Sequence, residues 1–442
     1  MARRRASQAA RERLEPEDLE ILRLESPIVA GHTLKVAVLD PPGQGGPLDL
    51  DALRGRIATR IEGAPRLRRR LEMRGDRKAA AWVDDPGFDV REHVRASPAA
   101  GPLSHGGLQL ICARMMEERL DRARPLWTID LVDPLDDGGL AVIWRIHHSM
   151  ADGATAMRLL QDVLWDQSVP GTGAKGAQGH ARPGAQLREA LDARRPGRLP
   201  GTLRRELQRT RFPSPFDGTI GSSRAVSFVS VPLGAVRDAA KALAPGATVN
   251  DAVLALVAGG LRRWVEGRGD RLGTVRVKVP VSLHHNSESP EAANRDSFFS
   301  VALPLMEADP VERLRRVRAD TALRKRSRDP LVLDALLRDI GRLPPLRRLL
   351  DRLTLHPRAF ALNVSNVAGP AERPSLVGAR LRSLYSVAEI RERHGLRVAV
   401  ISLADELNFG LCADPAIVGE LDSLAGGILT EADELEARAA AG

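Results

Sequence analysis

The sequence of 442 residues is poor in aromatic and sulfur-containing side chains. Aromatic residues make up only 3% of it, with a single Tyr and five Trp, so the core must be built mainly from Leu, Val, Ala and Ile. Stacking of nucleic-acid bases on aromatic side chains is therefore disfavoured. The two cysteines, Cys112 and Cys412, lie 300 positions apart and form no Cys-x-x-Cys pair. This spacing argues against a disulfide scaffold and a structural zinc site and is typical of a protein of the reducing cytosol.

A long hydrophobic run is also missing. The longest apolar stretch, 252–261, is well short of the roughly 20 residues that a membrane-spanning helix needs. The amino terminus starts basic but turns acidic and polar where a signal peptide would be apolar. We expect no transmembrane segment, no signal peptide and a cytoplasmic location, with contact at the inner face of the plasma membrane left open.

Positive charge is abundant, and it is almost entirely arginine. The net charge is +9, and only six of the 66 basic residues are lysine. Such a balance favours an anionic partner, and nucleic acid, an anionic membrane surface and a phosphorylated cofactor such as CoA all qualify. The charge alone does not choose between them.

Strand and helix patterns alternate along the chain, which predicts an α/β fold in two halves. A stretch rich in Gly, Pro and Arg around one basic helical piece separates the halves, giving predicted domains at 1–168 and 221–442 with a linker at 169–220. The segment 310–355 is predicted to be helical and basic, and either packs on a sheet or touches membrane or lipid. Strands are expected at 34–39, 139–146, 225–233, 275–283, 298–305, 360–367 and 396–404, and helices at 50–62, 153–166, 235–243 and 248–267.

The chemistry is concentrated in the run HHSMADG, residues 147–153, in the turn between a predicted strand and a predicted helix. A neutral imidazole at such an edge can take the proton of an attacking hydroxyl, and we assign this role of general base to His148. His147 is expected to support the site. Asp152 stands where a carboxylate caps a helix, so we interpret it as a structural organiser, and Gly153 permits the tight turn.

The alternative is a pair of surface histidines beside an ordinary helix cap. A second pair, His284 and His285, has no Asp-Gly after it and is interpreted as loop. The spacing His-His-x-x-x-Asp-Gly is rare enough to favour a site over this alternative.

These residues resemble the His-His-x-x-x-Asp-Gly signature of the bacterial wax ester synthase/diacylglycerol acyltransferase family. Other blocks resemble the family in the same order over about residues 14–420: Pro125-Leu126-Trp127, Asn250-Asp251, and NVSNVAGP with Asn363 and Asn366. Two segments depart from its pattern, Gly395-Leu396-Arg397 and the residues 27–32, and both bear on the acceptor pocket more than on the chemistry.

The resemblance implies two mixed-sheet domains similar to chloramphenicol acetyltransferase and condensation domains, with a tunnel between them. It implies transfer of a fatty acyl group from acyl-CoA, as co-substrate, to diacylglycerol or a long-chain fatty alcohol, with peripheral contact with membrane or lipid droplets. We expect no permanently bound cofactor, no metal and no specific nucleic acid. Structural roles remain open for Asn250, Asp251, Asn363 and Asn366, and core packing is favoured for Trp127.

Two alternatives to this function remain. One is an acyltransferase of the same fold that uses a carrier-protein thioester or a polar acceptor. The other is a lipid-binding homologue without catalysis, which the intact His148 and Asp152 disfavour. The sequence leaves the acceptor, the acyl chain length and the oligomeric state undetermined.

Overall fold

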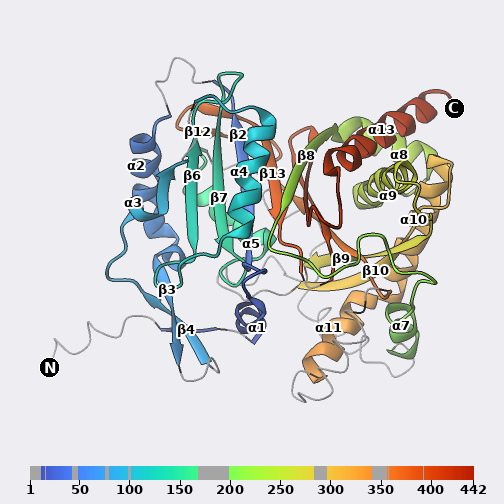
Figure 1. Cartoon of the computed structure of the whole chain (residues 1–442), viewed down its shortest axis with the longest axis horizontal. Coiled ribbons are helices and arrows are strands. Elements are labelled where there is room, and N and C mark those ends of the chain that lie inside the picture. Colours follow the sequence, from blue (N-terminus) through green and yellow to red (C-terminus); the bar gives the residue numbers. More distant parts are fainter. Residues whose placement is uncertain are drawn as a thin grey trace.

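The computed structural model describes residues 11–14, 16–41, 48–74, 79–97, 101–167, 199–282, 296–340, 356, 358–391 and 393–442. These residues form two mixed sheets of six strands each and a small antiparallel sheet of three strands. The small sheet consists of β1 (Glu12–Arg13), β4 (Ala79–Asp84) and β3 (Arg69–Arg74). The two large sheets lie next to each other, one in each half of the molecule (Figure 1).

The first large sheet has the strand order β12-β13-β2-β7-β6-β5. Helices α2 (Leu50–Arg60) and α5 (Gly153–Val163) pack on one face, and α4 (His105–Glu117) packs on the other. Short helices α1 (Pro16–Leu24) and α3 (Val90–His93) lie at its margin. Its strands are β2 (His32–Leu39), β5 (Val94–Ala96), β6 (Trp127–Val132), β7 (Leu140–His147), β12 (Ser375–Leu376) and β13 (Ala379–Ala388).

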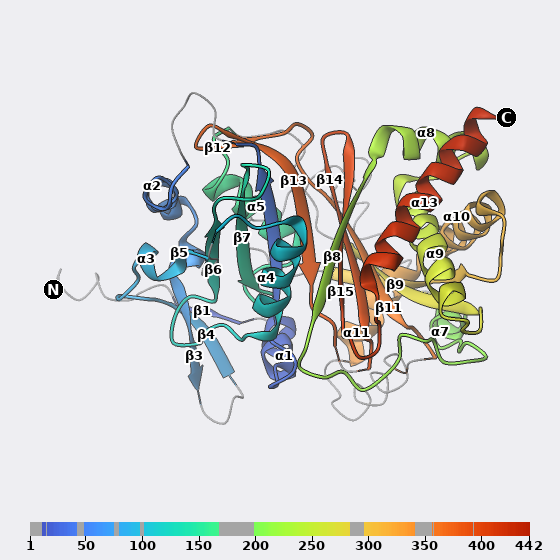
Figure 2. The same cartoon turned by 45° about the horizontal axis from the view of Figure 1, so that its top comes forward.

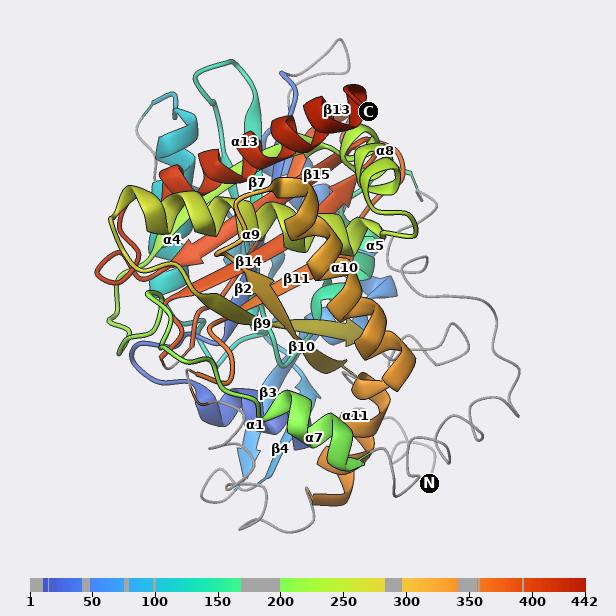
Figure 3. The ribbon, with the colours of Figure 1, turned by 90° about the vertical axis from the view of Figure 1, so that its right-hand side faces the viewer.

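The second large sheet has the order β10-β9-β11-β14-β15-β8. Helices α8 (Leu233–Leu243), α9 (Val249–Gly267), α10 (Pro310–Ser327) and α13 (Leu421–Ala440) cover its outer face, as Figure 3 shows. The inner face is turned toward the first sheet. Its strands are β8 (Ala225–Pro232), β9 (Thr274–Ser282), β10 (Asp296–Pro304), β11 (Leu362–Ala368), β14 (Leu396–Leu403) and β15 (Glu406–Ala413).

Strand β13 joins the two halves of the molecule. It comes from the second half of the chain but pairs antiparallel with β2 of the first sheet, and β12 extends the same edge (Figure 2). Its Ser386 touches Gly410 of β15 so closely that a Cβ at position 410 would overlap the Ser386 carbonyl oxygen. Glycine at 410 therefore allows the backbones of the two sheets to meet.

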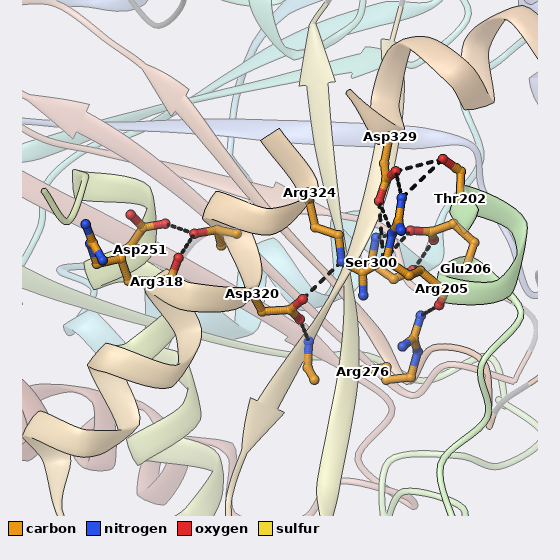
Figure 4. A network of polar contacts seen from close by, with 12 residues as sticks. Thr202, Arg205, Glu206, Asp251, Arg276, Ser300, Arg318, Asp320, Arg324 and Asp329 are labelled. Carbon is orange, nitrogen blue, oxygen red and sulfur yellow. Dashed lines mark hydrogen bonds and ion pairs between the residues drawn. The ribbon is translucent and has the colours of Figure 1, made fainter. Parts of the chain in front are cut away.

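A buried ionic cluster, here called the α7 network, fixes helix α7 (Leu199–Glu206) to the second half (Figure 4). Asp329, at the start of α11 (Asp329–Ile340), has no exposed surface, and its Oδ2 accepts from Arg205 Nε at 2.8 Å. The buried Glu206 accepts from Ser300 Oγ at 2.6 Å, and Arg324 lies within 3.5 Å of both carboxylates. Cations and carboxylates are thus paired throughout this cluster.

The strands and helices predicted from the sequence are confirmed to within a few residues. The structure differs from the predicted division of the chain in two places. Residues 199–220, assigned to the linker, pack into the second half through α7, and residues 375–388, assigned to the second domain, complete the first sheet. Contacts between segments that are distant in sequence leave no local pattern, so neither difference could be predicted from the sequence. Residues 168–198, 341–355 and the pair His284-His285 lie outside the described residues.

Candidate active site

The run from His147 to Gly153 forms the connection between the end of β7 and the start of α5. The backbone N–H of His148 donates to the Gly31 carbonyl at 2.9 Å, and that of Met150 donates to the His147 carbonyl at 2.9 Å. The Met150 side chain is buried in the core of the first half. Both ends and the middle of the turn are therefore fixed, so its side chains project in defined directions.

His147 is enclosed by protein on both ring nitrogens. Its Nδ1 accepts from the Ser149 backbone N–H at 3.1 Å and lies 2.7 Å from Ser149 Oγ, and its Nε2 lies 2.7 Å from Glu25 Oε1. Because Nδ1 accepts, the ring proton is on Nε2 and faces the carboxylate. Burial lowers the pKa of His147 against the opposing effect of Glu25. With 1% of its surface exposed, His147 can hold the turn but does not present a nitrogen to substrate.

Gly31 is required beside this pair. Its φ of +77° is a conformation that favours glycine, and a Cβ there would overlap His147 Nε2 and approach Glu25 Cγ at 2.9 Å. The approach of Glu25 to His147 thus depends on glycine, which has no side chain, at the position immediately before β2.

His148 is the histidine of the pair that is partly exposed. Burial, together with the nearby guanidinium groups of Arg391 and Arg397, lowers the pKa of His148 to about 3. Its imidazole is therefore neutral at physiological pH, the state that a proton acceptor needs.

Asp152 and Gly153 begin helix α5. Asp152 is 1% exposed, and its Oδ1 accepts from the Thr155 backbone N–H at 2.6 Å, which makes it the N-cap. A Cβ at Gly153 would lie 3.3 Å from Val367 of β11, so the helix start abuts the second sheet. The cap agrees with the predicted role of organiser for Asp152. For Gly153, which is predicted to permit the tight turn, the structure shows instead a close approach to Val367.

The Pro-Leu-Trp block supports β7 from the neighbouring strand. Pro125, Leu126 and Trp127 are all buried, and the Leu126 carbonyl accepts from the His147 backbone N–H at 2.9 Å. Trp127 donates through Nε1 to the Leu67 carbonyl at 2.7 Å and stacks on His93 at 4.5 Å between ring centroids. These contacts agree with the preferred interpretation of Trp127 as core packing.

Asn250 and Asp251 lie at the start of α9, away from the turn. Asp251 forms a capping box with Thr248 and accepts from Thr321 Oγ1 at 2.7 Å, so its carboxylate is fully used in structure. Asn363 and Asn366 lie on β11, and both are partly exposed. Asn363 stands opposite Arg397 on β14 and Lys278 on β9, on the face of the sheet that also carries Val367.

Several charged residues beside the turn carry no recognisable motif. Glu25 follows α1, and Glu389 and Arg391 follow β13. Glu389 is 3% exposed and accepts the backbone N–H groups of Ala30 and Gly31. Of these charged residues, Lys35 could have been noticed in the sequence, because it interrupts the apolar pattern of β2. A charged residue in a buried strand requires a partner.

Lys35 is 3% exposed, and its Nζ donates to Ser386 Oγ at 2.6 Å. Burial and then the charge of Arg397 lower the pKa of Lys35 to about 8, whereas Asp152 opposes the shift. Lys35 therefore belongs electrostatically to the surroundings of the turn.

Other types of site find no support in the described part of the chain. It contains no group of three or more His, Cys, Asp or Glu side chains that could hold a metal ion, and none of its helices is both long and apolar enough to cross a membrane. Cys112 and Cys412 are buried free thiols, and burial raises the pKa of both, that of Cys412 to about 12. Neither is suited to act as a thiolate nucleophile.

Comparison with protein families matches the wax ester synthase/diacylglycerol acyltransferase catalytic domain over residues 14–209 and the WS/DGAT C-terminal domain over residues 292–436. The chain belongs to the wax ester synthase/diacylglycerol acyltransferase family. A probable diacylglycerol O-acyltransferase of Mycobacterium tuberculosis is 31% identical over 419 residues, which cover 89% of this chain and 88% of the relative. This WS/DGAT protein is an acyltransferase that transfers an acyl group to an alcohol, as predicted from the turn and its flanking blocks.

Solved structures give the same fold. The wax ester synthase/diacylglycerol acyltransferase of Marinobacter aquaeolei VT8 superposes with a TM-score of 0.72 at 22% identity, covering 97% of this chain and 100% of that one. A starter condensation domain of rhizomide synthetase, solved with C8-CoA and Leu-SNAC, superposes with a TM-score of 0.60 at 14% identity, covering 99% and 96%. The predicted two-domain α/β architecture of the condensation-domain type is confirmed.

Proposed function

We propose that this WS/DGAT protein transfers a fatty acyl group from acyl-CoA to the hydroxyl of a lipid alcohol, diacylglycerol or a long-chain alcohol, with His148 as general base. The observation that carries the proposal is the contrast between the two adjacent histidines. His147 is buried with both ring nitrogens engaged by Ser149 and Glu25, whereas His148 is partly exposed.

In the proposed step, an imidazole nitrogen of His148 takes the proton of the acceptor hydroxyl as its oxygen attacks the thioester carbonyl carbon. The C–O bond forms, the C–S bond breaks, and the imidazolium returns the proton to the departing CoA sulfur. The products are an ester and free CoA. No covalent enzyme intermediate is required.

The other residues of the turn would act through position. Asp152 caps α5 and orients the turn, Gly153 permits close contact with β11, and His147 with Glu25 fixes the end of β7. The proposed donor and acceptor meet between the two sheets, in the predicted tunnel, since His148 follows the end of β7 and α5 abuts β11 of the other sheet.

A second candidate is the same transfer from a carrier-protein thioester. The likeness in fold to condensation domains favours it. The donor separates the two candidates, because an acyl-CoA enzyme turns over with acyl-CoA alone and is inhibited by free CoA, whereas a carrier-dependent enzyme has no such turnover.

We also propose a cytoplasmic protein with peripheral contact with membrane or lipid droplets, consistent with its lipid acceptor. The basic helix α10 is a weaker candidate for this contact than its composition suggests. Arg313 is 1% exposed and binds Glu431 at 2.7 Å, and Arg324 belongs to the α7 network. These two arginines point into the protein.

The test is an ester-forming assay with palmitoyl-CoA and either dioleoylglycerol or hexadecanol, run on the wild type and on His148→Ala. The variant should retain its melting temperature and lose about 10²- to 10⁴-fold in kcat, as expected for the loss of a general base. Ser223→Ala, a change at an exposed loop position outside the turn, serves as the matched control and should keep full activity. A His148→Ala enzyme with most of the wild-type rate would refute the assignment of the base.

A further inference from the structure

Three polar side chains form a row across the inner face of the second sheet: Lys278 on β9, Asn363 on β11 and Arg397 on β14. Asn363 stands directly opposite both of the others in the strand register. Residues opposite one another on adjacent strands point to the same face, about 4.8 Å apart. Their neighbours along the strands, such as Val277 and Val398, belong to the core beneath the outer helices. The row therefore faces the first sheet.

Arg397 is the member of this row with spare hydrogen-bonding capacity. Its Nη1 donates to the Glu389 carbonyl at 3.0 Å, whereas its buried Nε has no acceptor within the described part of the chain. The adjacent carboxylate of Glu389 is engaged by the backbone of Ala30 and Gly31. One edge of the Arg397 guanidinium thus keeps the two parallel N–H donors that suit a carboxylate or phosphate.

The charge around this edge is predominantly positive. We define the positive cluster as Lys35, Arg391 and Arg397. Burial, followed by the charge of Arg391, lowers the pKa of Arg397 to about 10 against the opposing charge of Glu389. Arg397 in turn lowers the pKa of Lys35, against the opposing charge of Asp152. Lys35 is buried, and Arg391 and Arg397 are partly exposed. Like charges held this close repel one another, and an additional anion would reduce this cost.

The cluster also acts on the proposed base. Arg391 and Arg397 are the two charges that, after burial, most depress the pKa of His148. An anion bound beside them would offset this effect and make the imidazole a stronger base. Binding and chemistry would then improve together.

We propose that the positive cluster binds an anionic group of the acceptor, so that the preferred acceptor is an alcohol with a carboxylate or phosphate a few bonds from its hydroxyl. This inference rests on the proposed acyl transfer from acyl-CoA with His148 as base, and it makes an anionic hydroxy lipid, rather than the neutral diacylglycerol or long-chain alcohol, the preferred acceptor. The donor does not supply the anion at this place, because the acyl chain is neutral and the pantetheine arm separates the CoA phosphates from the thioester. The anionic group itself is unchanged by the reaction.

The test compares acceptors with and without an anionic group, each with palmitoyl-CoA. One arm uses 3-hydroxyhexadecanoate against its methyl ester, and the other uses 1-palmitoylglycerol 3-phosphate against 1-palmitoylglycerol. We expect kcat/KM to be about 10- to 100-fold higher for the anionic member of at least one pair, the size expected for a charge-assisted bidentate contact. The arm that shows the preference identifies the anion.

Arg397→Gln should bring this ratio close to one, and Arg397→Lys, which keeps the charge without the planar edge, should give an intermediate ratio. The matched control is Arg382→Gln on β13, a half-exposed arginine paired with Asp137, which should leave the ratio unchanged. Arg397→Gln should also move the acid limb of the pH profile to higher pH, because removal of a cation raises the pKa of His148.

An equal or higher kcat/KM for the neutral members would overturn the inference while leaving the proposed function intact. So would a ratio that Arg397→Gln does not change, or a rise in KM for palmitoyl-CoA alone, which would assign Arg397 to the donor. Failure to acylate any of these acceptors or hexadecanol would instead contradict the proposed function itself.

Discussion

The molecule contains two groups of buried charges that are built on opposite plans. In the α7 network, Arg205 and Arg324 face the carboxylates of Asp329 and Glu206 at hydrogen-bond or ion-pair distance. In the positive cluster, Arg397 contacts only a backbone carbonyl and Lys35 contacts only a hydroxyl among the described residues. Both groups combine buried residues with partly exposed ones, so burial alone does not distinguish them.

The difference in hydrogen-bond partners separates charges that stabilise the fold from charges that we propose bind a ligand. A complete set of partners makes the α7 network self-sufficient, and α7 docks on the second half without further help. In the positive cluster, neither the Arg397 hydrogen bond nor the Lys35 hydrogen bond is made to a carboxylate, and Arg391 and Arg397 act on the proposed base. The presence of arginine in the interior therefore does not by itself indicate a functional site. The kind of partner that each arginine contacts is the more informative observation.

The largest expected effect is the loss of a partner in the α7 network. Asp329→Ala leaves the buried Arg324 and the partly exposed Arg205 without one of their carboxylates. It should lower the free energy of unfolding by about 3 to 5 kcal/mol. The matched control is Asp238→Ala, whose exposed ion pair with Arg237 should be worth at most about 1 kcal/mol. Urea denaturation of both variants measures the difference, and equal losses would show that pairing in the network does not stabilise α7.

Acid should weaken the first half through its histidines, whereas the α7 network contains none. Burial, then electrostatic interaction with Arg145 and His147, lowers the pKa of His32 to about 3. The unfolded chain binds this proton near pH 6.5 and the folded chain does not, so stability falls as pH drops from 6.5 toward 3.

His32 contributes about 1.4 kcal/mol per pH unit to this fall in the free energy of unfolding, or roughly 2 kcal/mol between pH 6.5 and 5. In His32→Gln this share of the slope should vanish, which denaturant titrations at pH 7 and pH 5 would reveal. Identical slopes in variant and wild type would contradict the assignment.

The smallest expected effect concerns Asp152, which belongs to the turn but is proposed to act structurally. Asp152→Ala should cost about 1 kcal/mol through the lost N-cap, whereas Asp152→Asn keeps a capping oxygen and should cost less. If Asp152 is an organiser, kcat of Asp152→Asn stays within about tenfold of wild type, far from the loss expected for His148→Ala. A loss as large as that of His148→Ala would instead give the carboxylate a part in proton transfer.

The local part of the site could be predicted from the sequence, and the assembled part could not. His148, Asp152 and Gly153 lie within six residues, in the turn after β7 and at the start of α5, so their arrangement is encoded locally. Glu25 and Glu389 reach the same place only through the pairing of β2 with β7 and β13. Such contacts between distant segments leave no periodicity to detect in a single sequence.

The same limit applied to the fold. Strands with apolar runs, such as β7 and β14, were predicted because burial on both faces leaves a continuous pattern. Strand β13 lacks such a run, since Arg380 and Arg382 interrupt its first half. Its place in the first sheet depends on its partner β2 and on the close contact at Gly410, neither of which is visible in its own residues.

The pairing of β13 with β2 also determines when the first sheet can be completed during translation. Strand β2 ends at Leu39 and its edge partner begins at Ala379, so the ribosome must add about 340 residues before that edge is covered. At ordinary elongation rates of about 5 to 20 residues per second, this takes roughly 17 to 70 seconds. During that interval, an apolar strand edge could recruit other chains. We therefore expect the nascent chain to bind a chaperone until its second half emerges.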